Sequence, residues 1–218
     1  MADDTFFDDH ERATVRAAMA RIIPTDDTPG ATEAGTVDFV DRYLSGTGYI
    51  YAKPDGSGFE QLTGKRQEAW QQRIEVVRER YRTGIRALDE RARSRHGADF
   101  VDLGPAEQDG VLHDLEQPAL AQEAELEAAR TTLYGAPVEP ALQQASVEID
   151  LQFVPLLALH TRQGFYSDPI YGGNRDRVGW QVIGFPGPES LAEVHTGRYS
   201  TLDYFADTRQ HPGEGDAS

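Results

Sequence analysis

The chain has 218 residues, enough for one sizeable core, and contains no cysteine, which excludes disulfides, thiolate clusters and a cysteine nucleophile. Its 37 acidic and 21 basic residues give a net charge of −16, which argues against nucleic acid or an anionic membrane as a partner. Only Lys53 and Lys65 are lysines; either a salt-loving source or a genome rich in arginine codons explains this bias.

The first predicted helix has a clear start and stop. Asp8 is a candidate N-cap with Glu11 as its capping-box partner, and Pro24 ends the apolar pattern. After a turn, apolar residues at helical spacing predict a second helix from about Thr32 to Leu44.

Residues 46–64 break the helical pattern. Short aromatic runs flank Pro54–Gly58, which could form a β-hairpin turn; an irregular surface loop is the alternative. Because an isolated two-stranded hairpin is marginally stable in water, this insert is expected to lie against another part of the chain.

Residues 66–95 give the strongest helix prediction, which His96–Gly97 ends with a basic residue followed by a C-terminal glycine. Apolar residues recur every three or four positions and predict a seam facing one core. The seam consists of Trp70, Ile74, Val77, Tyr81, Ile85 and Leu88.

Three further helical segments are predicted before residue 167. Pro105 opens a short helix, and the alanine- and glutamate-rich residues 118–134 favour an exposed one. A last long helix is expected from about Glu139 to Tyr166, apolar almost all round and therefore central. Pro155 lies inside it and is expected to kink it near Leu151.

The stretch Gly164–Gly187 combines glycines and prolines with large aromatic residues, directly after an apolar run. Ordinary linkers carry few aromatic rings, so this composition favours an ordered loop that contacts another surface. No regular secondary structure is predicted after Asp168–Pro169. The proposed contact residues are Phe165, Tyr166, Tyr171, Gly172, Gly173, Asn174, Arg175, Asp176, Arg177, Trp180 and Phe185.

Tyr171–Asn174 superficially resembles a glycine-rich nucleotide loop. Such a loop follows a strand and opens a helix, whereas these glycines follow a predicted helix, so phosphate binding is not favoured. Instead, the two glycines are expected to take positive φ, so that Tyr171 and Trp180 can point the same way.

No set of residues in the sequence amounts to an active site. The six histidines lack the spacing of a helical metal pair, and no metal site is predicted. Asp26 and Asp168 are expected to make turn hydrogen bonds rather than act in acid–base pairs. His160 is expected to be a buried, hydrogen-bonded core histidine, and Ser167 has no base beside it in sequence.

The sequence as a whole predicts one all-α domain, an irregular bundle of about six helices. Its helical body covers residues 6–166, an ordered contact arm residues 167–202, and a flexible acidic tail residues 203–218. No run is apolar enough to span a bilayer, and the acidic start Met-Ala-Asp-Asp lacks a secretion signal, so the sequence as written predicts a cytoplasmic location.

Five blocks of this sequence, taken in order, resemble the gluconate 2-dehydrogenase subunit 3 family. The resemblance spans roughly residues 6–188, and the last block is its most specific part. The blocks are Asp9–Thr14, Ile22–Ala31, Gly35–Asp41, Tyr81–Ile85 and Gly164–Gly187.

The resemblance implies a small, non-catalytic subunit of a sugar or polyol dehydrogenase. It implies that FAD and the catalytic histidine belong to a large subunit of the glucose–methanol–choline type, that a cytochrome c subunit is often a third partner, and that this chain carries no cofactor. Family members support folding of the flavin subunit and often supply its twin-arginine export signal. This sequence has no such signal, so a periplasmic location would require a trimmed leader.

Two other functions are compatible with the same aromatic stretch. Aromatic side chains also stack on sugar rings, so a stand-alone carbohydrate-binding protein is one alternative. A homo-oligomer whose arm embraces a second copy is the other. The sugar, the oxidised carbon and the electron acceptor cannot be read from this chain.

Overall fold

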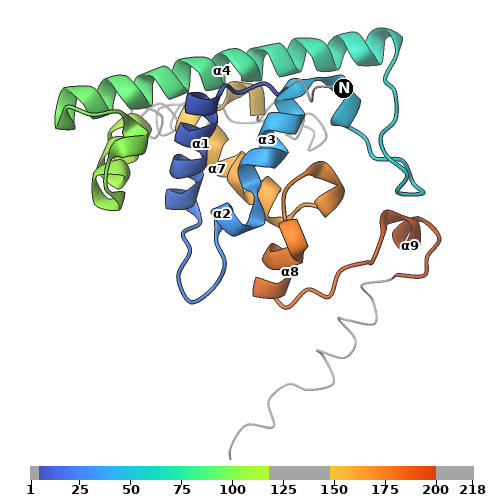
Figure 1. Ribbon diagram of the computed structural model, residues 1–218. Coiled ribbons are helices and arrows are strands. Elements are labelled where there is room, and N and C mark those ends of the chain that lie inside the picture. Colours follow the sequence, from blue (N-terminus) through green and yellow to red (C-terminus); the bar gives the residue numbers. More distant parts are fainter. Residues whose placement is uncertain (1–4, 118–147, 200–218) are drawn as a thin grey trace, which may run out of the picture.

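The computed structural model describes residues 5–117 and 148–199, and their regular structure is helical, as the sequence predicts (Figure 1). Within these ranges the only β-type pairing is a single antiparallel bridge between Ala52 and Phe59. None of the described helices combines the length and apolar character needed to cross a bilayer.

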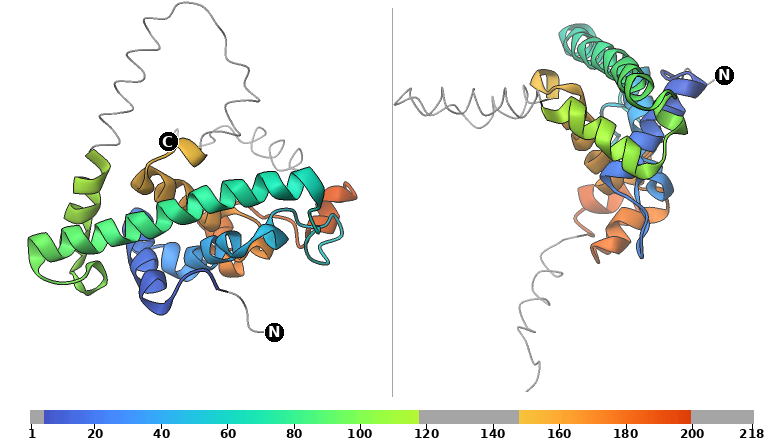
Figure 2. Two further views of the ribbon diagram at one scale, coloured as in Figure 1. Left: turned by 90° about the horizontal axis from the view of Figure 1, so that it is seen from above. Right: turned by 90° about the vertical axis from the view of Figure 1, so that its left-hand side faces the viewer.

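One long helix, α4 (Gly64–His96), crosses one side of the molecule, and α1 (Asp9–Ile22), α3 (Thr36–Ser45) and α7 (Phe153–Tyr166) pack beneath it (Figures 1 and 2). Among these, α3 and α7 make the most extensive contact. The main core lies between the four helices, which each bury one apolar face there.

The first helix begins as predicted. The Asp8 side chain accepts a hydrogen bond from Glu11 N, and Glu11 completes the capping box. The expected single helix over residues 32–44 is wrong, because Gly35 adopts φ 65° and divides it into α2 (Ala31–Ala34) and α3. The left-handed conformation closes α2 as a C-cap and starts α3 in a new direction.

Helix α4 confirms the predicted seam. Its five residues from Ile74 to Leu88 are buried, Trp70 is half-buried, and Gly97 ends the helix with φ 78°. Gly84 is required on this face, because a Cβ atom there would lie 2.0 Å from the ring of Phe153. The glycine therefore lets the start of α7 approach the backbone of α4 closely.

The kinked helix predicted to run into Tyr166 is corrected by the structure. Helix α7 begins only at Phe153, after a break at Leu151–Gln152, so Pro155 lies in its first turn rather than its interior. Proline is tolerated in the first turn because its missing N–H has no intrahelical partner there. The predicted helix at 118–134 and the start near Glu139 lie outside the described residues.

After α4, the chain forms the turn η2 (Phe100–Asp102) and a helical segment at 105–117, which starts at the predicted proline. The insert contains η1 (Thr47–Tyr49) and then a tight turn in which Lys53 N donates to Gly58 O at 2.7 Å. This turn has hairpin-like bonding but is too short to count as a strand pair in the described structure.

The arm contains more regular structure than expected. Four short elements follow one another: η3 (Pro169–Tyr171), η4 (Arg175–Arg177), α8 (Val178–Val182) and α9 (Leu191–His195). Each is five residues or fewer, too short to produce a helical period in the sequence. Figure 1 shows them on the side of the molecule away from α4.

Candidate functional site

The arm folds back onto its own helical body through glycines. A Cβ atom at Gly173 would lie 2.1 Å from Gly164 O, and one at Gly179 would lie 1.9 Å from Phe165 O. Both positions are buried against the end of α7. Any side chain there would push the arm off α7, so these glycines serve close backbone approach.

This packing corrects the expected role of the two central glycines. Gly172 takes positive φ, at 102°, but Gly173 does not. The rings that they were expected to align contact different parts of the chain: Tyr171 lies against Phe59 of the insert, with centroids 5.6 Å apart, whereas Trp180 packs within the arm itself.

Trp180 is the aromatic anchor of the arm and faces inward. Its side chain is 6% exposed, and its Nε1 donates to Tyr166 O at 2.8 Å. The Phe185 ring stands edge-on to it at 5.3 Å, and Gly187 lies so close under the indole that a Cβ atom would meet it at 2.1 Å. Trp180 therefore fixes the arm's shape from within rather than offering its ring to a partner.

The turn before α8 carries an unusual backbone strain. Asn174, Asp176 and Arg177 are not glycines, yet all three have φ between 48° and 59°. Such residues cost roughly 1–3 kcal/mol each and persist only where the surroundings hold them. The fully buried Asn174 supplies much of this support, because its amide donates to Ser167 O and accepts from Gly179 N, both at 2.9 Å.

Ion pairs connect this turn to the start of the chain. Arg175 donates to Asp38 Oδ2 on α3 at 2.6 Å, and the other oxygen of Asp38 accepts from Arg12 on α1. Arg12 also donates to Asp41 at 2.6 Å. A second arginine, Arg42, donates to Ile170 O at 2.8 Å. The strained turn is thus held against both helices.

The eleven proposed contact residues fall into three groups by exposure. Tyr166, Arg175 and Asp176 are exposed; Tyr171, Gly172, Arg177 and Phe185 are half-buried; Phe165, Gly173, Asn174 and Trp180 are buried. The structure therefore brings most of them together, but only part of the group faces outward.

Three exposed apolar side chains in the described part of the arm were missed in the sequence: Val194 in α9, and the neighbouring pair Val182 and Ile183. Val182 is 39% exposed and Ile183 is 53% exposed, at the end of α8. The start of helix α8 separates this pair from the strained turn, which ends at Arg177. The sequence offered a weak signal, an apolar pair between Gln181 and Gly184, but without a predicted helix nothing indicated which way these residues would face.

A buried polar cluster lies under α4 and α7. Glu148 Oε2 accepts from Arg73 Nε at 2.7 Å, and Glu148 Oε1 lies 3.0 Å from one ring nitrogen of His160. The other ring nitrogen lies 2.9 Å from the Tyr81 hydroxyl. His160 is 1% exposed with partners at both nitrogens, which confirms the expected core histidine.

Interactions within the cluster shift the pKa values of its members. Burial opposes ionisation of Glu148, but the hydrogen bond and charge of His160, with Arg73, outweigh it and lower the Glu148 pKa to about 2. Burial and then the Glu148 charge raise the pKa of Tyr43, and burial also raises that of Tyr81. The cluster therefore combines a carboxylate with neutral phenols at physiological pH.

The acidic residues considered for catalysis act in turns. Asp26 accepts from both Thr28 N and the Thr28 hydroxyl at 2.8 Å, and Asp168 accepts from Ile170 N at 2.9 Å. Both arrangements confirm the expected turn hydrogen bonds.

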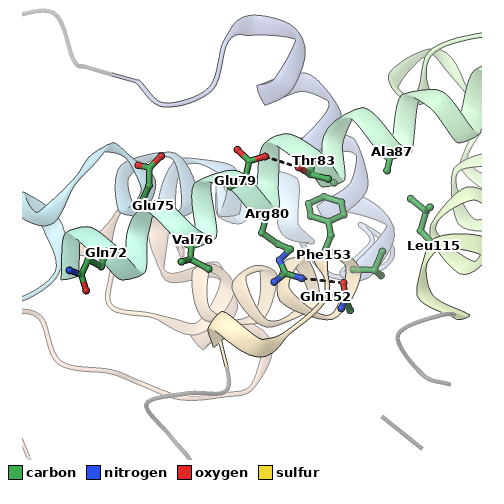
Figure 3. Close-up of a pocket in the computed structure, with 12 residues that line it drawn as sticks. Gln72, Glu75, Val76, Glu79, Arg80, Thr83, Ala87, Leu115, Gln152 and Phe153 are labelled. Carbon is green, nitrogen blue, oxygen red and sulfur yellow. Dashed lines mark hydrogen bonds between the residues drawn. The ribbon is translucent and has the colours of Figure 1, made fainter. Parts of the chain in front are cut away.

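A further groove, which was not predicted, lies between α4, the start of α7 and the helical segment at 105–117. Its volume is about 1020 Å³, and Val76, Ala87, Leu115 and Phe153 give it an apolar lining (Figure 3). Glu79 and Arg80 lie along it, bonded to Thr83 and Gln152 respectively.

The described residues define a helical protein whose most constrained surface is the folded-back arm. The sequence pattern of the gluconate 2-dehydrogenase subunit 3 family matches residues 9–187, so the chain belongs to that family. No curated protein and no solved structure matches the chain significantly. The family match takes in α1, the Asp38 ion pairs and the arm as far as Gly187.

Proposed function

We propose that this chain is a non-catalytic small subunit, which binds and stabilises the FAD-containing catalytic subunit of a sugar or polyol dehydrogenase. Membership of a family described as a dehydrogenase subunit supports this proposal. The catalytic subunit is of the glucose–methanol–choline type, the pair forms a heterodimer, and FAD and the redox chemistry belong to that partner. A cytochrome c subunit is a possible third member of the complex.

The observation that carries the proposal is the strained turn beside two exposed apolar residues. Backbone strain of this kind clusters at functional sites, where the surrounding structure holds it in place. Here the strain presents the exposed residues Arg175 and Asp176, and α8 then ends in Val182 and Ile183. Arginine is enriched among binding hot spots, and the buried centre of an interface is apolar, so this combination fits a contact surface.

The proposed interface is therefore the outer side of residues 175–183, with Tyr166 beside it. The buried residues of the arm, Asn174 and Trp180 above all, pre-organise this surface and so reduce the entropy lost on binding. Their inward position means that substitutions there test the fold of the arm, not the contact itself.

Co-expression with the flavin subunit tests the proposal. Ile183→Asp puts a charge on the most exposed apolar residue of the proposed interface and should lower the affinity for the flavin subunit by about 30-fold or more, the effect of a hot spot. Val76→Asp is the matched control, because Val76 is similarly exposed, at 46%, but lies on α4. Circular dichroism must show that both variants fold.

Recovery of the flavin subunit with the tagged chain is the readout. The proposal predicts that the wild type and Val76→Asp retain the flavin subunit and that Ile183→Asp loses it. Equal recovery with all three proteins would contradict the proposed interface. A wild-type chain that elutes as a homodimer and never retains a flavin subunit would instead favour the homo-oligomer alternative.

A further inference from the structure

A second cavity lies between α3, α4, the end of α7 and the arm, and the interface proposed above does not account for it. Its volume is about 550 Å³, within the roughly 300–1,000 Å³ range of small-molecule pockets. The residues that line it are Phe39, Tyr43, Tyr49, Ile50, Trp70, Arg73, Glu148, Gln163, Tyr166, Ser167 and Tyr171. More than half of these are aromatic.

The aromatic wall is supported from outside the cavity by the insert. The Phe59 ring stands edge-on between Tyr49 and Tyr171, at 5.4 and 5.6 Å, and the Tyr51 ring stands edge-on to Trp70 at 5.9 Å. Neither Phe59 nor Tyr51 lines the cavity. Edge-to-face packing from behind fixes the lining rings without filling the space between them.

One hydroxyl group of the lining is left without a partner. The Ser167 Oγ is buried and has no hydrogen-bond partner among the described residues, whereas the Tyr43 hydroxyl interacts with Glu148 and Arg73. An unsatisfied buried hydroxyl is costly, so a bound molecule that completes its hydrogen bonding would be favoured there. Gln163, which is exposed, adds an amide that can both donate and accept.

The charges of the lining are balanced. Arg73 and Glu148 are paired with each other at 2.7 Å, and both contribute to the wall. An anionic or cationic ligand would therefore find no unpaired countercharge among these residues. The remaining polar groups are hydroxyls and an amide, which match ligand hydroxyls because both sides can donate and accept.

We propose that this cavity binds a neutral, hydroxyl-bearing ring of the sugar or cyclic-polyol class. The apolar C–H faces of such a ring lie against Trp70 and the tyrosines, and its hydroxyls bond to Ser167 and Gln163. This binding site belongs to the chain itself and does not depend on the flavin subunit.

Titration of the full-length chain tests the site. The probes are D-glucose and maltose as neutral sugars, gluconate as an anion and phenol as a flat aromatic ring, followed by calorimetry and by tryptophan fluorescence. We expect saturable binding of at least one neutral sugar, with a Kd on the order of 1 mM. Trp70→Ala should weaken it about tenfold by removing the stacking surface, and Ser167→Ala about threefold by removing one hydrogen bond.

Val76→Ala is the matched control, since Val76 lines the other groove, and it should bind as the wild type does. Absence of saturation with both sugars at their solubility limit would overturn the proposal. So would sugar binding that persists unchanged in a folded Trp70→Ala variant, or binding of phenol or gluconate alone. Because the flavin subunit is absent from the titration, either result leaves the outcome of the co-expression experiment unaffected.

Discussion

Trp180 shows how a single buried residue stabilises the folded position of the arm. Its ring is buried between Phe185 and Gly187, and its N–H bonds to Tyr166 O. Trp180→Ala leaves a large cavity and an unpaired carbonyl, and should lower the free energy of unfolding by about 3 kcal/mol. Ile183→Ala, at a site 53% exposed, should change it by less than about 0.5 kcal/mol.

Urea unfolding of the isolated chain, followed by circular dichroism, measures this difference. If Trp180→Ala were as stable as Ile183→Ala, the inward packing of the indole would not hold in solution.

Glu148 gives the protein a pH-dependent contribution to stability. Its pKa is lowered in the folded state from 4.5 to about 2 by His160 and Arg73, against the effect of burial. The folded state therefore gains stability that is present above pH 4.5 and is lost as the pH falls toward 2. The size of this contribution is on the order of 3 kcal/mol.

Comparison with Glu148→Gln isolates this effect, because the other carboxyl groups titrate in both proteins. The stability difference between wild type and variant should be largest near neutral pH and should shrink below pH 4.5. A difference that stays constant down to pH 2 would show that the buried carboxylate is not stabilised in this way.

Among the elements, the contact between α7 and α8 depends on a glycine. A methyl group at Gly179 would lie 1.9 Å from Phe165 O, with no flexible side chain able to yield. Gly179→Ala should therefore release the arm while the four main helices remain folded. Gly48→Ala is the control, because that position has open space and no positive φ.

Limited proteolysis measures this release. The Gly179→Ala chain should be cut within residues 167–187 well before the helical body, whereas wild type and Gly48→Ala should resist there. Equal resistance to proteolysis in all three proteins would show that the arm tolerates a side chain at position 179, where it lies against α7.

Some elements could be predicted because their signals are local. The Asp8 capping box and the seam of α4 each lie within one stretch of sequence, and both were found there. The break at Gly35 depends on how α3 and Arg175 pack around it, with a guanidinium nitrogen 3.1 Å from the position of a Cβ atom. The start of α7 likewise depends on Phe153 meeting Gly84, a contact between distant segments.

At the scale of the whole molecule, composition identified the arm but not its orientation. The same aromatic residues can face inward or outward, and only the close approach of Gly173 and Gly179 to α7 decides that Trp180 is buried. The family match was predictable from its ordered blocks. The exposed pair Val182–Ile183 was not predictable, because α8 is too short to produce a helical period in the sequence. The aromatic cavity was not predictable either, because its lining comes from segments far apart in the sequence.

The central claim is that the outer side of residues 175–183 binds the flavin subunit while the inner side stays packed on the chain. Hydrogen–deuterium exchange, compared between the free chain and its complex with the flavin subunit, tests this most directly. Residues 175–183 should gain strong protection on binding, and α1 should change little. Unchanged exchange at 175–183 in a stable complex would contradict the claim.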